Sequence, residues 1–509
     1  MRREVVMVMR TPSPAPAGKG WGEGESFSCA RVLRLGALFL ALFGCATPRV
    51  LAPAPASIAA RGDAVDWKAV GAEAVDFLSR YLQVDTRNPP GNETRGAEFL
   101  AAEFEKVGIA SETWEFVPGR GSLVARLKAT GAPSEKPLCL LSHLDVVTAE
   151  DDEWPPDAQP LSGAVKDGFV WGRGALDMKG MGAIEALTLI LLARQHVPLK
   201  RDVILLAVAD EEVDNAGMHL LTEKHWNELD CGVLINEGGI GLRGLLFENQ
   251  TVFPITVAEK GTLWLRIVAK GAAGHGSTPT PGRATDALVR AVAKIRAREP
   301  KPTIHLSLYE LLARVGAQKG GLTGFVLSHP SLVDLLVTGK LMANPATRAA
   351  LTNTCQVTGW EGKGSAPNVI PSKVAAIVDC RVLPNTKPEV FLEELRGLLR
   401  EDGDDITLEV ISSEPASESA TDDPLLVALE RNLRHGREDI VVGPAISPGF
   451  TDSNLARPKG TKAYGLVPFE IDAELLGTMH GKHERLPIKE LTRGLEVLYR
   501  SVLEVSAQP

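Results

Sequence analysis

Three short, uninterrupted apolar segments constrain the fold of this chain more than any other feature. They are Pro137–Ser142, Val203–Val208 and Cys231–Ile235, and none of them contains a charged residue. Strands this apolar are typical of parallel sheets, which are buried on both faces. The segment Met181–Arg194 is interpreted as the helix between the first two strands. The sequence therefore predicts an α/β fold with a mixed, mainly parallel sheet flanked by helices, and a ligand site at the carboxyl ends of the strands.

A different pattern begins near Thr256. Thr262–Ala269 and Lys373–Val382 alternate apolar and polar residues, as strands with one exposed face do, and helix candidates lie between and after them. Residues 304–358 fit neither pattern and are interpreted as an insertion. The predicted division of the chain is residues 1–45 as an N-terminal extension and signal, 46–62 as a linker, 63–255 and 416–509 as the α/β domain, and 256–415 as an inserted smaller α+β domain.

The N-terminus has the features of an export signal. Arg31 and Arg34 precede an uncharged run of 10 residues, Leu35–Gly44, and Cys45 follows. A membrane-spanning helix needs about 20 residues, so the run is too short to span, but it fits a secretory signal. Leu42–Cys45 resembles a bacterial lipobox, which predicts an exported chain attached to the membrane by a lipid on Cys45. An ordinary signal peptide with an incidental cysteine is the alternative.

Composition bears on the partners and on the cysteines. The chain has 55 Lys and Arg against 64 Asp and Glu, a formal net charge of -9, and no dense basic segment. Nucleic acid is therefore excluded as a partner. The later cysteines form no CxxC pair, so we expect buried small apolar side chains rather than metal ligands or a disulfide framework. These cysteines are Cys139, Cys231, Cys355 and Cys380.

Histidine and carboxylate side chains follow each of the three apolar segments. In chain order they are His143 and Asp145, then Glu211 and Glu212, then Glu237. Asp177 stands in a glycine-rich loop before a helix, and His480 lies near the C-terminus. Carboxylates that converge at one sheet edge repel each other unless a cation neutralises them. Histidine and carboxylate ligands suit zinc, and five candidate ligands suit two ions with a bridging Asp better than one tetrahedral ion.

The order of these motifs resembles one enzyme family. His143-Leu-Asp, Asp177 in its glycine-rich loop, Glu211-Glu, Glu237-Gly-Gly and His480-Gly-x-x-Glu-Arg follow one another as in the co-catalytic zinc metallopeptidases. That family includes aminoacylase, carboxypeptidase G and succinyl-diaminopimelate desuccinylase. The last two motifs are most similar to the branch of carboxypeptidase S and the secreted N-acyl-amino-acid hydrolases. The resemblance runs from about residue 63 to 505 and also includes an opening segment at residues 84–91.

The resemblance implies two divalent metal ions per chain, most readily Zn²⁺, with Co²⁺ or Mn²⁺ as alternatives. The implied ligands are Asp177 as the bridge, His143 and Glu237 in one site, and Glu212 and His480 in the other. Asn236 is the alternative to Glu237, and His483 is the alternative to His480. The peptide bond after Asp177 is implied to be cis.

The resemblance also implies roles in catalysis and substrate binding. Glu211 would be the general base that takes a proton from water and hands it to the leaving amine, and Asp145 would hold the His143 imidazole. In the small domain, which would serve as a lid and in homodimerisation, His275 would stabilise the oxyanion in the partner subunit's site. The implied substrate-binding residues are Asn368, Arg381 as a clamp for the substrate carboxylate, and Thr451 in a loop that resembles the family's substrate loop. A solvent-facing strand residue is the alternative for Arg381.

These features predict a metal-dependent hydrolase for the amide bond of an N-acyl amino acid or of a short peptide. A desuccinylase-type deacylase is the second enzyme hypothesis, but it would need an extra basic residue in the acyl pocket that the sequence does not reveal. A non-catalytic binding lipoprotein on the same scaffold ranks last, because every implied ligand and the general base are present.

Overall fold

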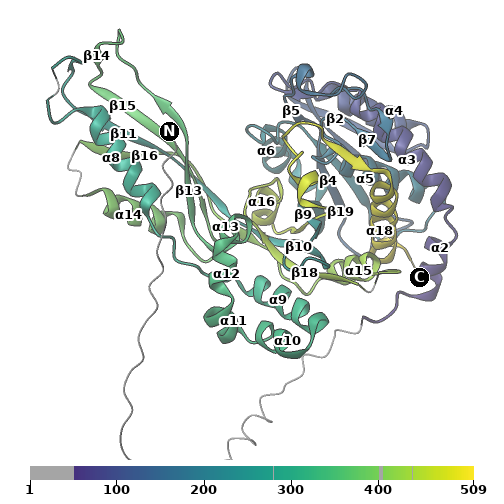
Figure 1. Ribbon diagram of the computed structural model, residues 1–509. Coiled ribbons are helices and arrows are strands. Elements are labelled where there is room, and N and C mark those ends of the chain that lie inside the picture. Colours follow the sequence, from purple (N-terminus) through teal and green to yellow (C-terminus); the bar gives the residue numbers. More distant parts are fainter. Residues whose placement is uncertain (1–50, 279, 401–404, 438, 509) are drawn as a thin grey trace, which may run out of the picture. The chain divides into compact units, whose positions relative to one another are not determined.

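The computed structural model describes residues 51–278, 280–400, 405–437 and 439–508 (Figure 1). The described residues all belong to one compact unit. The predicted export signal and Cys45 lie outside the described residues. Within these ranges, no helix combines the length and the apolar composition needed to cross a membrane.

A nine-stranded mixed sheet is the largest layer of the protein. Its strand order is β17-β10-β19-β9-β4-β8-β3-β2, and β18 pairs with β10. The neighbouring strands β19, β9, β4 and β8 run parallel, whereas β3 and β2 add antiparallel pairs at one end. The strands are β2 (Ala110–Val117), β3 (Arg120–Leu127), β4 (Leu138–His143), β8 (Val203–Val208), β9 (Val233–Arg243), β10 (Thr251–Glu259), β17 (Ser417–Glu418), β18 (Ile440–Ser447) and β19 (Lys462–Ile471). The predicted fold class is confirmed.

Helices cover both faces of this sheet. Side chains alternate along a strand, so Leu138 and Leu140 of β4 enter one core while Cys139 and Leu141 enter another. This double burial explains why the central strands are uninterrupted apolar segments. The first core is covered by α2 (Ala56–Asp63), α3 (Trp67–Leu82), α4 (Thr94–Glu105), α5 (Lys179–Arg194), α15 (Pro424–Leu433) and α18 (Ile488–Ser506), and the second by α6 (Ala216–Leu220), the π-helix Leu221–His225, α7 (Trp226–Leu229) and α16 (Ser453–Ala456).

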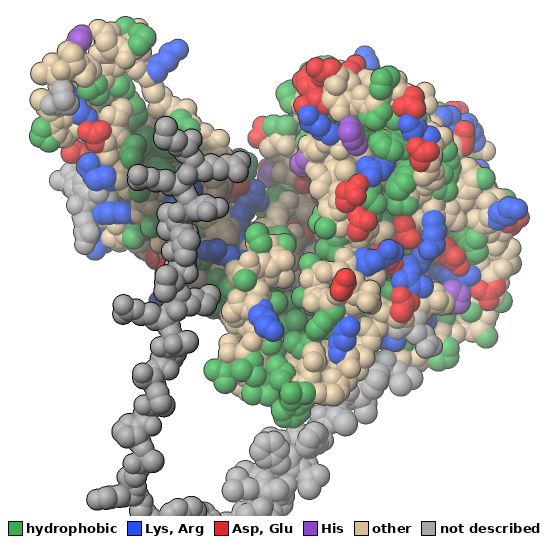
Figure 2. Space-filling model, viewed as in Figure 1, with side chains coloured by type: hydrophobic (Ala, Val, Ile, Leu, Met, Phe, Trp, Pro, Cys, Tyr) green, Lys and Arg blue, Asp and Glu red, His purple; other side chains and the backbone are tan. Residues whose placement is uncertain are grey.

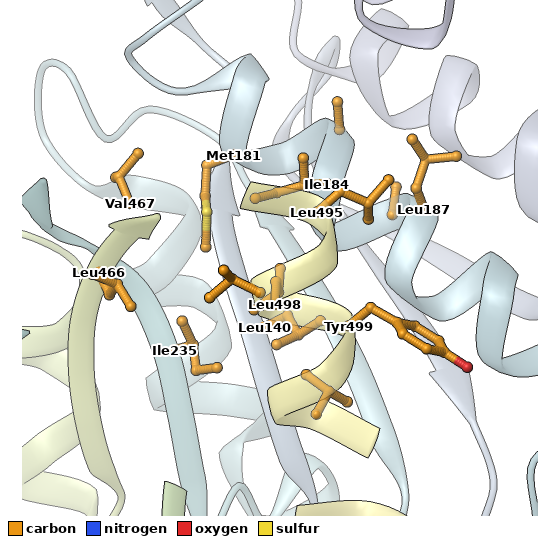
Figure 3. Close-up of a cluster of buried hydrophobic side chains, with 14 of the residues drawn as sticks. Leu140, Met181, Ile184, Leu187, Ile235, Leu466, Val467, Leu495, Leu498 and Tyr499 are labelled. Atoms are coloured by element: carbon orange, nitrogen blue, oxygen red, sulfur yellow. The ribbon is translucent and has the colours of Figure 1, made fainter. Parts of the chain in front are cut away.

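The final helix, α18, completes the first core. Its buried residues Leu491, Leu495, Leu498 and Val502 recur at three- and four-residue spacing, which places them on one face. Figure 3 shows Leu495 and Leu498 beside residues of α5, β4 and β9. The C-terminal segment therefore packs against the strands and the helix that carry the predicted site.

Two disulfides correct the interpretation of the cysteines. Cys139 bonds to Cys231 across 92 residues of sequence, and Cys355 bonds to Cys380. Cys139 lies on β4 and Cys231 just before β9, and these strands are parallel neighbours. The pairing follows from strand adjacency, which Cys spacing along the sequence does not encode. The prediction that these four cysteines are unpaired is wrong.

A second, four-stranded sheet has the order β13-β15-β11-β16 and is entirely antiparallel. The chain leaves β10 of the large sheet and enters β11, the first strand of the small sheet, at Lys260. It returns to the large sheet between Glu414 and Ser417. Two helices pack on one of its faces around a separate apolar core. The elements are β11 (Gly261–Lys270), α8 (Ala284–Ala297), β13 (Thr354–Glu361), β15 (Lys373–Val382), α14 (Pro388–Leu399) and β16 (Ile406–Glu414), with a two-stranded ribbon of β12 (Gly274–His275) and β14 (Val369–Ile370).

Five helices occupy most of the segment 304–358. Leu311, Leu312 and Val315 share a core with Val252 of β10 and Val441 of β18. The segment is inserted between strands of the small sheet in sequence, but it packs on the edge of the large sheet in space. The helices are α9 (Leu306–Lys319), α10 (Gly321–Leu327), α11 (Pro330–Leu336), α12 (Thr338–Ala343) and α13 (Pro345–Leu351).

Candidate metal centre

The parallel strands deliver the predicted ligands to one edge of the large sheet. His143 is the last residue of β4 and pairs in register with Val208, the last residue of β8. Glu211 and Glu212 follow β8 after a short turn, so they lie beside His143. Glu237 lies within β9, which continues beyond the predicted strand end at Ile235.

Asp177 lies between the two histidines. Its Oδ1 is 3.1 Å from His143 Nε2, and its Oδ2 is 2.9 Å from His480 Nε2. The loop of Asp177 follows β7 (Phe169–Trp171), and β20 (Arg485–Pro487) after His480 pairs with β7. A small sheet completed by β6 (Val165–Lys166) thus joins two segments that are about 300 residues apart in sequence. Each carboxylate oxygen of Asp177 faces a different histidine nitrogen, which is the geometry of a bridging ligand.

Three further carboxylates, those of Glu212, Glu211 and Glu237, complete the cluster. Glu212 Oε2 is 3.2 Å from His480 Nε2, and Glu212 Oε1 is buried without a hydrogen-bond partner in the described part of the chain. Glu211 and Glu237 each place an oxygen with a His143 nitrogen in a group whose atoms lie within 4.8 Å of one another. His143, Asp177 and Glu212 form a second such group.

The charges of the cluster perturb its pKa values strongly. Burial and the neighbouring Glu237 raise the pKa of Glu211 well above its ordinary value, and burial and Asp177 do the same to Glu237. Hydrogen bonds to Asp177 and Glu212 raise the pKa of His480 to about 10. Burial opposes ionisation of Asp177, but its two histidine partners hold its pKa far below the usual range. The cluster thus has a surplus of buried negative charge that protonated histidines neutralise only in part.

The donor set fits two divalent cations. Two imidazole nitrogens and four carboxylates converge without a thiolate, which suits zinc or a similar ion. The unpaired buried oxygen of Glu212 and the mutual repulsion of Glu211 and Glu237 are both relieved by a bound cation. The peptide bond between Asp177 and Met178 is cis, as the resemblance implies.

The two alternative ligands point elsewhere. Asn236 donates hydrogen bonds from its side-chain amide to Thr451 Oγ1 and Ser453 Oγ, and only 2% of its surface is exposed. His483 Nε2 lies 3.1 Å from the backbone oxygen of Glu153 and does not belong to the cluster. The geometry therefore favours Glu237 and His480 as ligands.

Gly239 has no side chain, so β9 can pack closely against β10 two residues after Glu237. A Cβ atom built on Gly239 would overlap the backbone oxygen of Pro254 on β10. The register between β9 and β19 also shifts around Asn236, where the strand is irregular. The Glu-Gly-Gly motif thus has a packing reason as well as a chemical one.

Asp145 is arranged differently from the role that the resemblance implies. His143 Nδ1 is 2.9 Å from the backbone oxygen of Asp145, whereas the nearest carboxylate oxygen is 3.6 Å away. The Asp145 carboxylate instead accepts hydrogen bonds from the backbone N–H groups of Glu211 and Glu212. Asp145 thus fixes the imidazole through its main chain and the Glu211–Glu212 turn through its side chain.

Glu484 is a supporting residue that sequence reasoning missed. Its side chain is fully buried and accepts four hydrogen bonds, from the guanidinium of Arg173 and from the backbone N–H groups of Gly174, Leu176 and Asp177. Burial raises its pKa, and Arg173 opposes that rise. The sequence feature that could have identified Glu484 is its position four residues after His480, within the His-Gly-x-x-Glu motif. Glu484 therefore joins the loop of His480 to the loop of Asp177.

A second missed network lies behind Asp145. Asn88 donates from its side-chain amide to Asp145 Oδ2 and Asp210 Oδ1, at 2.9 Å each. Arg120 bonds Asp210 and the fully buried Glu93. Asn88 belongs to β1 (Arg87–Asn88), inside the segment that resembles the family's opening, so the signal lay in a motif to which no role was given. Arg120 thus pairs with two of the three buried carboxylates of this network, Glu93 and Asp210, while Asn88 donates to Asp145 and Asp210.

Asp452 is a further buried acid near the cluster. Burial raises its pKa to about 7, although Asn215 donates a hydrogen bond to its carboxylate and His143 lies close enough to lower that pKa. The neighbouring Thr451, predicted to bind substrate, is only 6% exposed and donates its hydroxyl to Glu259 Oε1. The structure thus places Thr451 in a buried network beside the cluster.

The site residues of the predicted small domain are not part of the cluster. His275 Nε2 is 2.9 Å from the Asn368 side-chain nitrogen, so two separately predicted residues meet, and both are exposed. No hydrogen bond or ion pair between described residues joins them to the candidate ligands. Arg381 pairs with Asp379 through two hydrogen bonds and lines a cavity of about 390 Å³ that none of the candidate ligands lines.

Comparisons with known proteins agree with this geometry. Residues 139–504 match the model of peptidase family M20/M25/M40. The chain is 26% identical over 379 residues to the N-fatty-acyl-amino acid synthase/hydrolase PM20D1 of Homo sapiens, covering 73% of this chain and 74% of that protein. It is also 26% identical over 445 residues to aminoacylase-1B of Rattus norvegicus, covering 86% and 96%.

Solved structures share the fold. The M20 family metallo-carboxypeptidase Sso-CP2 from Sulfolobus solfataricus superposes with a TM-score of 0.63 at 18% identity, covering 85% of this chain and 99% of that one. Human carnosine dipeptidase 1 superposes with a TM-score of 0.59 at 14% identity, covering 89% and 99%. The family prediction is confirmed. The chain is a metal-dependent amide hydrolase that belongs to peptidase family M20/M25/M40.

Proposed function

We propose that this protein hydrolyses the amide bond of N-acyl amino acids, or of short peptides, with two divalent ions held by the candidate metal centre. The observation that carries the proposal is the position of Asp177, whose two oxygens face His143 and His480 from opposite sides. N-acyl amino acids are the first substrate class to test because the names of two relatives that align with most of this chain refer to acyl amino acids.

Each ion would have its own ligands beside the shared Asp177. His143 and Glu237 would hold one ion, and Glu212 and His480 the other. When bound, such ions polarise the scissile carbonyl and make water nucleophilic near neutral pH. Zinc fits the donor set, and cobalt or manganese would fit it too.

Glu211 is the proposed general base. It lies in the group with His143 and Glu237, while its backbone N–H is fixed by Asp145 Oδ1 at 3.1 Å. Its carboxylate accepts a proton from the attacking water and passes that proton to the leaving amine. Asp145 and Asn88 hold the Glu211–Glu212 turn in place, so that the base does not need to reorganise during the reaction.

The small domain would act through a second subunit. His275 and Asn368 contact each other and lie apart from the candidate ligands of their own chain. This arrangement supports a homodimer in which the partner supplies His275 to stabilise the oxyanion. A strictly monomeric protein with full activity would contradict this part of the proposal.

The protein is further proposed to be exported and attached to the membrane by a lipid on Cys45. The disulfides Cys139–Cys231 and Cys355–Cys380 support export, because disulfides persist in oxidising compartments such as the periplasm. A Cys45→Ser variant should no longer be labelled by a palmitate analogue in cells. Labelling equal to that of the wild type would contradict the anchor.

A substrate panel tests the proposed activity. N-acetyl, N-succinyl and long-chain N-acyl amino acids are compared with Gly-X dipeptides, before and after chelation and after metal is returned. We expect turnover of at least one N-acyl amino acid or dipeptide, loss of that turnover on chelation, and recovery with zinc. A preference for the N-succinyl compounds would favour a desuccinylase, and no turnover of any amide with metal present would contradict the proposal.

A further inference from the structure

The inserted helices expose an unusual group of leucines. Leu306, Leu322, Leu335 and Leu336 are 77%, 79%, 77% and 55% exposed, and we call them the leucine face. They lie on α9, α10 and α11, and the next most exposed leucine among the described residues, Leu476, is only 37% exposed. Figure 2 shows a concentration of apolar side chains at the lower end of the molecule, where Figure 1 places α10 and α11.

The sequence around three of these leucines, Leu322, Leu335 and Leu336, carries little charge. Residues 320–347 contain two charged side chains, Asp334 and Lys340, although 23% of the whole chain is charged. The Asp334 carboxylate accepts a hydrogen bond from the Tyr309 hydroxyl of α9, so the only acid of this segment is engaged within the protein. Exposed leucines with so little charge beside them are costly in water and mark a surface that contacts something apolar.

The start of the described chain lies close to these helices. Arg431 of α15 donates a hydrogen bond to the backbone oxygen of Ala52. The adjacent residue, Glu430, forms a 2.7 Å ion pair with Arg314 of α9. Cys45 lies seven positions before Ala52, and a chain of seven residues spans at most about 25 Å. A lipid on Cys45 would therefore keep α15 and α9 near the bilayer.

We propose that the leucine face lies in the surface of a lipid bilayer and inserts its side chains into the boundary between headgroups and acyl chains. Amphipathic helices that lie in the plane of a membrane bury their apolar side chains at this boundary. Interfaces between proteins favour Tyr, Trp and Arg as anchors, whereas Leu is under-represented among their hot spots. All of the exposed large apolar side chains on α9, α10 and α11 are leucine, so hydrocarbon fits the surface better than a protein partner does.

The experiment measures whether the protein binds vesicles when it lacks the proposed lipid anchor. The mature chain without its lipidated cysteine, residues 46–509, is mixed with phosphatidylethanolamine–phosphatidylglycerol vesicles and separated by flotation. The test variant changes Leu306, Leu322, Leu335 and Leu336 to Ser. The matched control changes four exposed valines elsewhere to Ser, namely Val117, Val289, Val390 and Val410. Circular dichroism of both variants verifies folding.

The wild-type chain and the valine control should float with vesicles, even at 0.5 M salt, and the leucine variant should show a partition coefficient at least tenfold lower. Absence of wild-type binding, equal loss in both variants, or release by salt would overturn the proposal. So would sedimentation equilibrium in which the wild type is a dimer and the leucine variant a monomer, because a second copy would then cover this face. Flotation does not depend on turnover or on Cys45, so this proposal and the proposed function fail independently.

Discussion

Replacing Glu484 with Gln perturbs the link between the two halves of the candidate metal centre. The Glu484 carboxylate is fully buried and receives four N–H donors, with the Arg173 guanidinium at 2.7 Å and three backbone N–H groups at 2.7–3.1 Å. A Gln amide has the same shape but only one acceptor oxygen. If that oxygen serves Leu176 and Asp177, the amide nitrogen faces the donors of Arg173 and Gly174.

The magnitude follows from the two bonds that are lost. Hydrogen bonds to charged groups contribute about 1.5–3 kcal/mol each, so the loss of two corresponds to about 3–6 kcal/mol. Breaking a buried ion pair costs about 3–5 kcal/mol, because one charge is left uncompensated. The side chain of Arg173 is only 3% exposed, so water cannot replace its partner. We expect the free energy of unfolding of metal-free Glu484→Gln to fall by about 4 kcal/mol.

Urea unfolding of the metal-free protein, followed by tryptophan fluorescence, measures this loss. The matched control is Glu474→Gln, because Glu474 is 81% exposed and pairs with Arg485 at 3.1 Å in the same region. An exposed ion pair contributes at most about 1 kcal/mol. Zinc affinity should also fall about 10–100-fold in Glu484→Gln, since its carboxylate orients the Asp177 loop. Equal unfolding free energies and equal zinc affinities in the two variants would refute the reasoning.

Three further predictions concern the base, a buried acid and the disulfides. Glu211→Gln should retain its metal but lose turnover by a factor of about 10²–10⁴, measured as kcat together with metal content; near-normal kcat with intact metal would contradict its role as the base. Burial raises the pKa of Glu185 to about 8, so the folded chain holds a proton that the unfolded chain releases, and the free energy of unfolding should fall by about 4 kcal/mol between about pH 5 and pH 8. Glu185→Gln should lack this contribution, and urea unfolding with the same pH dependence in both proteins would contradict it. Thiol titration of the denatured, unreduced mature chain should detect no free thiol, because Cys139–Cys231 and Cys355–Cys380 are bonded; four free thiols would contradict both disulfides.

The sequence predicted the fold best where a residue pattern is compatible with only one kind of structure. The uninterrupted apolar runs predicted β4 and β8 to within one residue, because strands buried on both faces exclude polar side chains. The ligands at the ends of these strands could be placed together because parallel strands end at one edge. The cis bond after Asp177 came from the family resemblance and not from the residues themselves.

The sequence was least informative about contacts between distant segments. The Cys139–Cys231 disulfide forms because β4 and β9 are neighbours in the sheet. The residues around each cysteine do not indicate which strands will pair. Asn88, Arg120 and Glu484 act through hydrogen bonds to other side chains or to backbone, so each resembles an ordinary polar residue in sequence. Segment 304–358 fitted neither sequence pattern, and nothing in its residues indicates that its helices pack on β10 and β18.

Metal content of the wild type and of Asp177→Ala tests the central claim most directly. The mature chain is dialysed against zinc, freed of loosely bound ions and analysed by mass spectrometry for zinc per chain. The account predicts two ions per wild-type chain and at most one in Asp177→Ala, because both histidines face the oxygens of this residue. One ion or none in the wild type, or two ions in both proteins, would contradict a centre that Asp177 bridges.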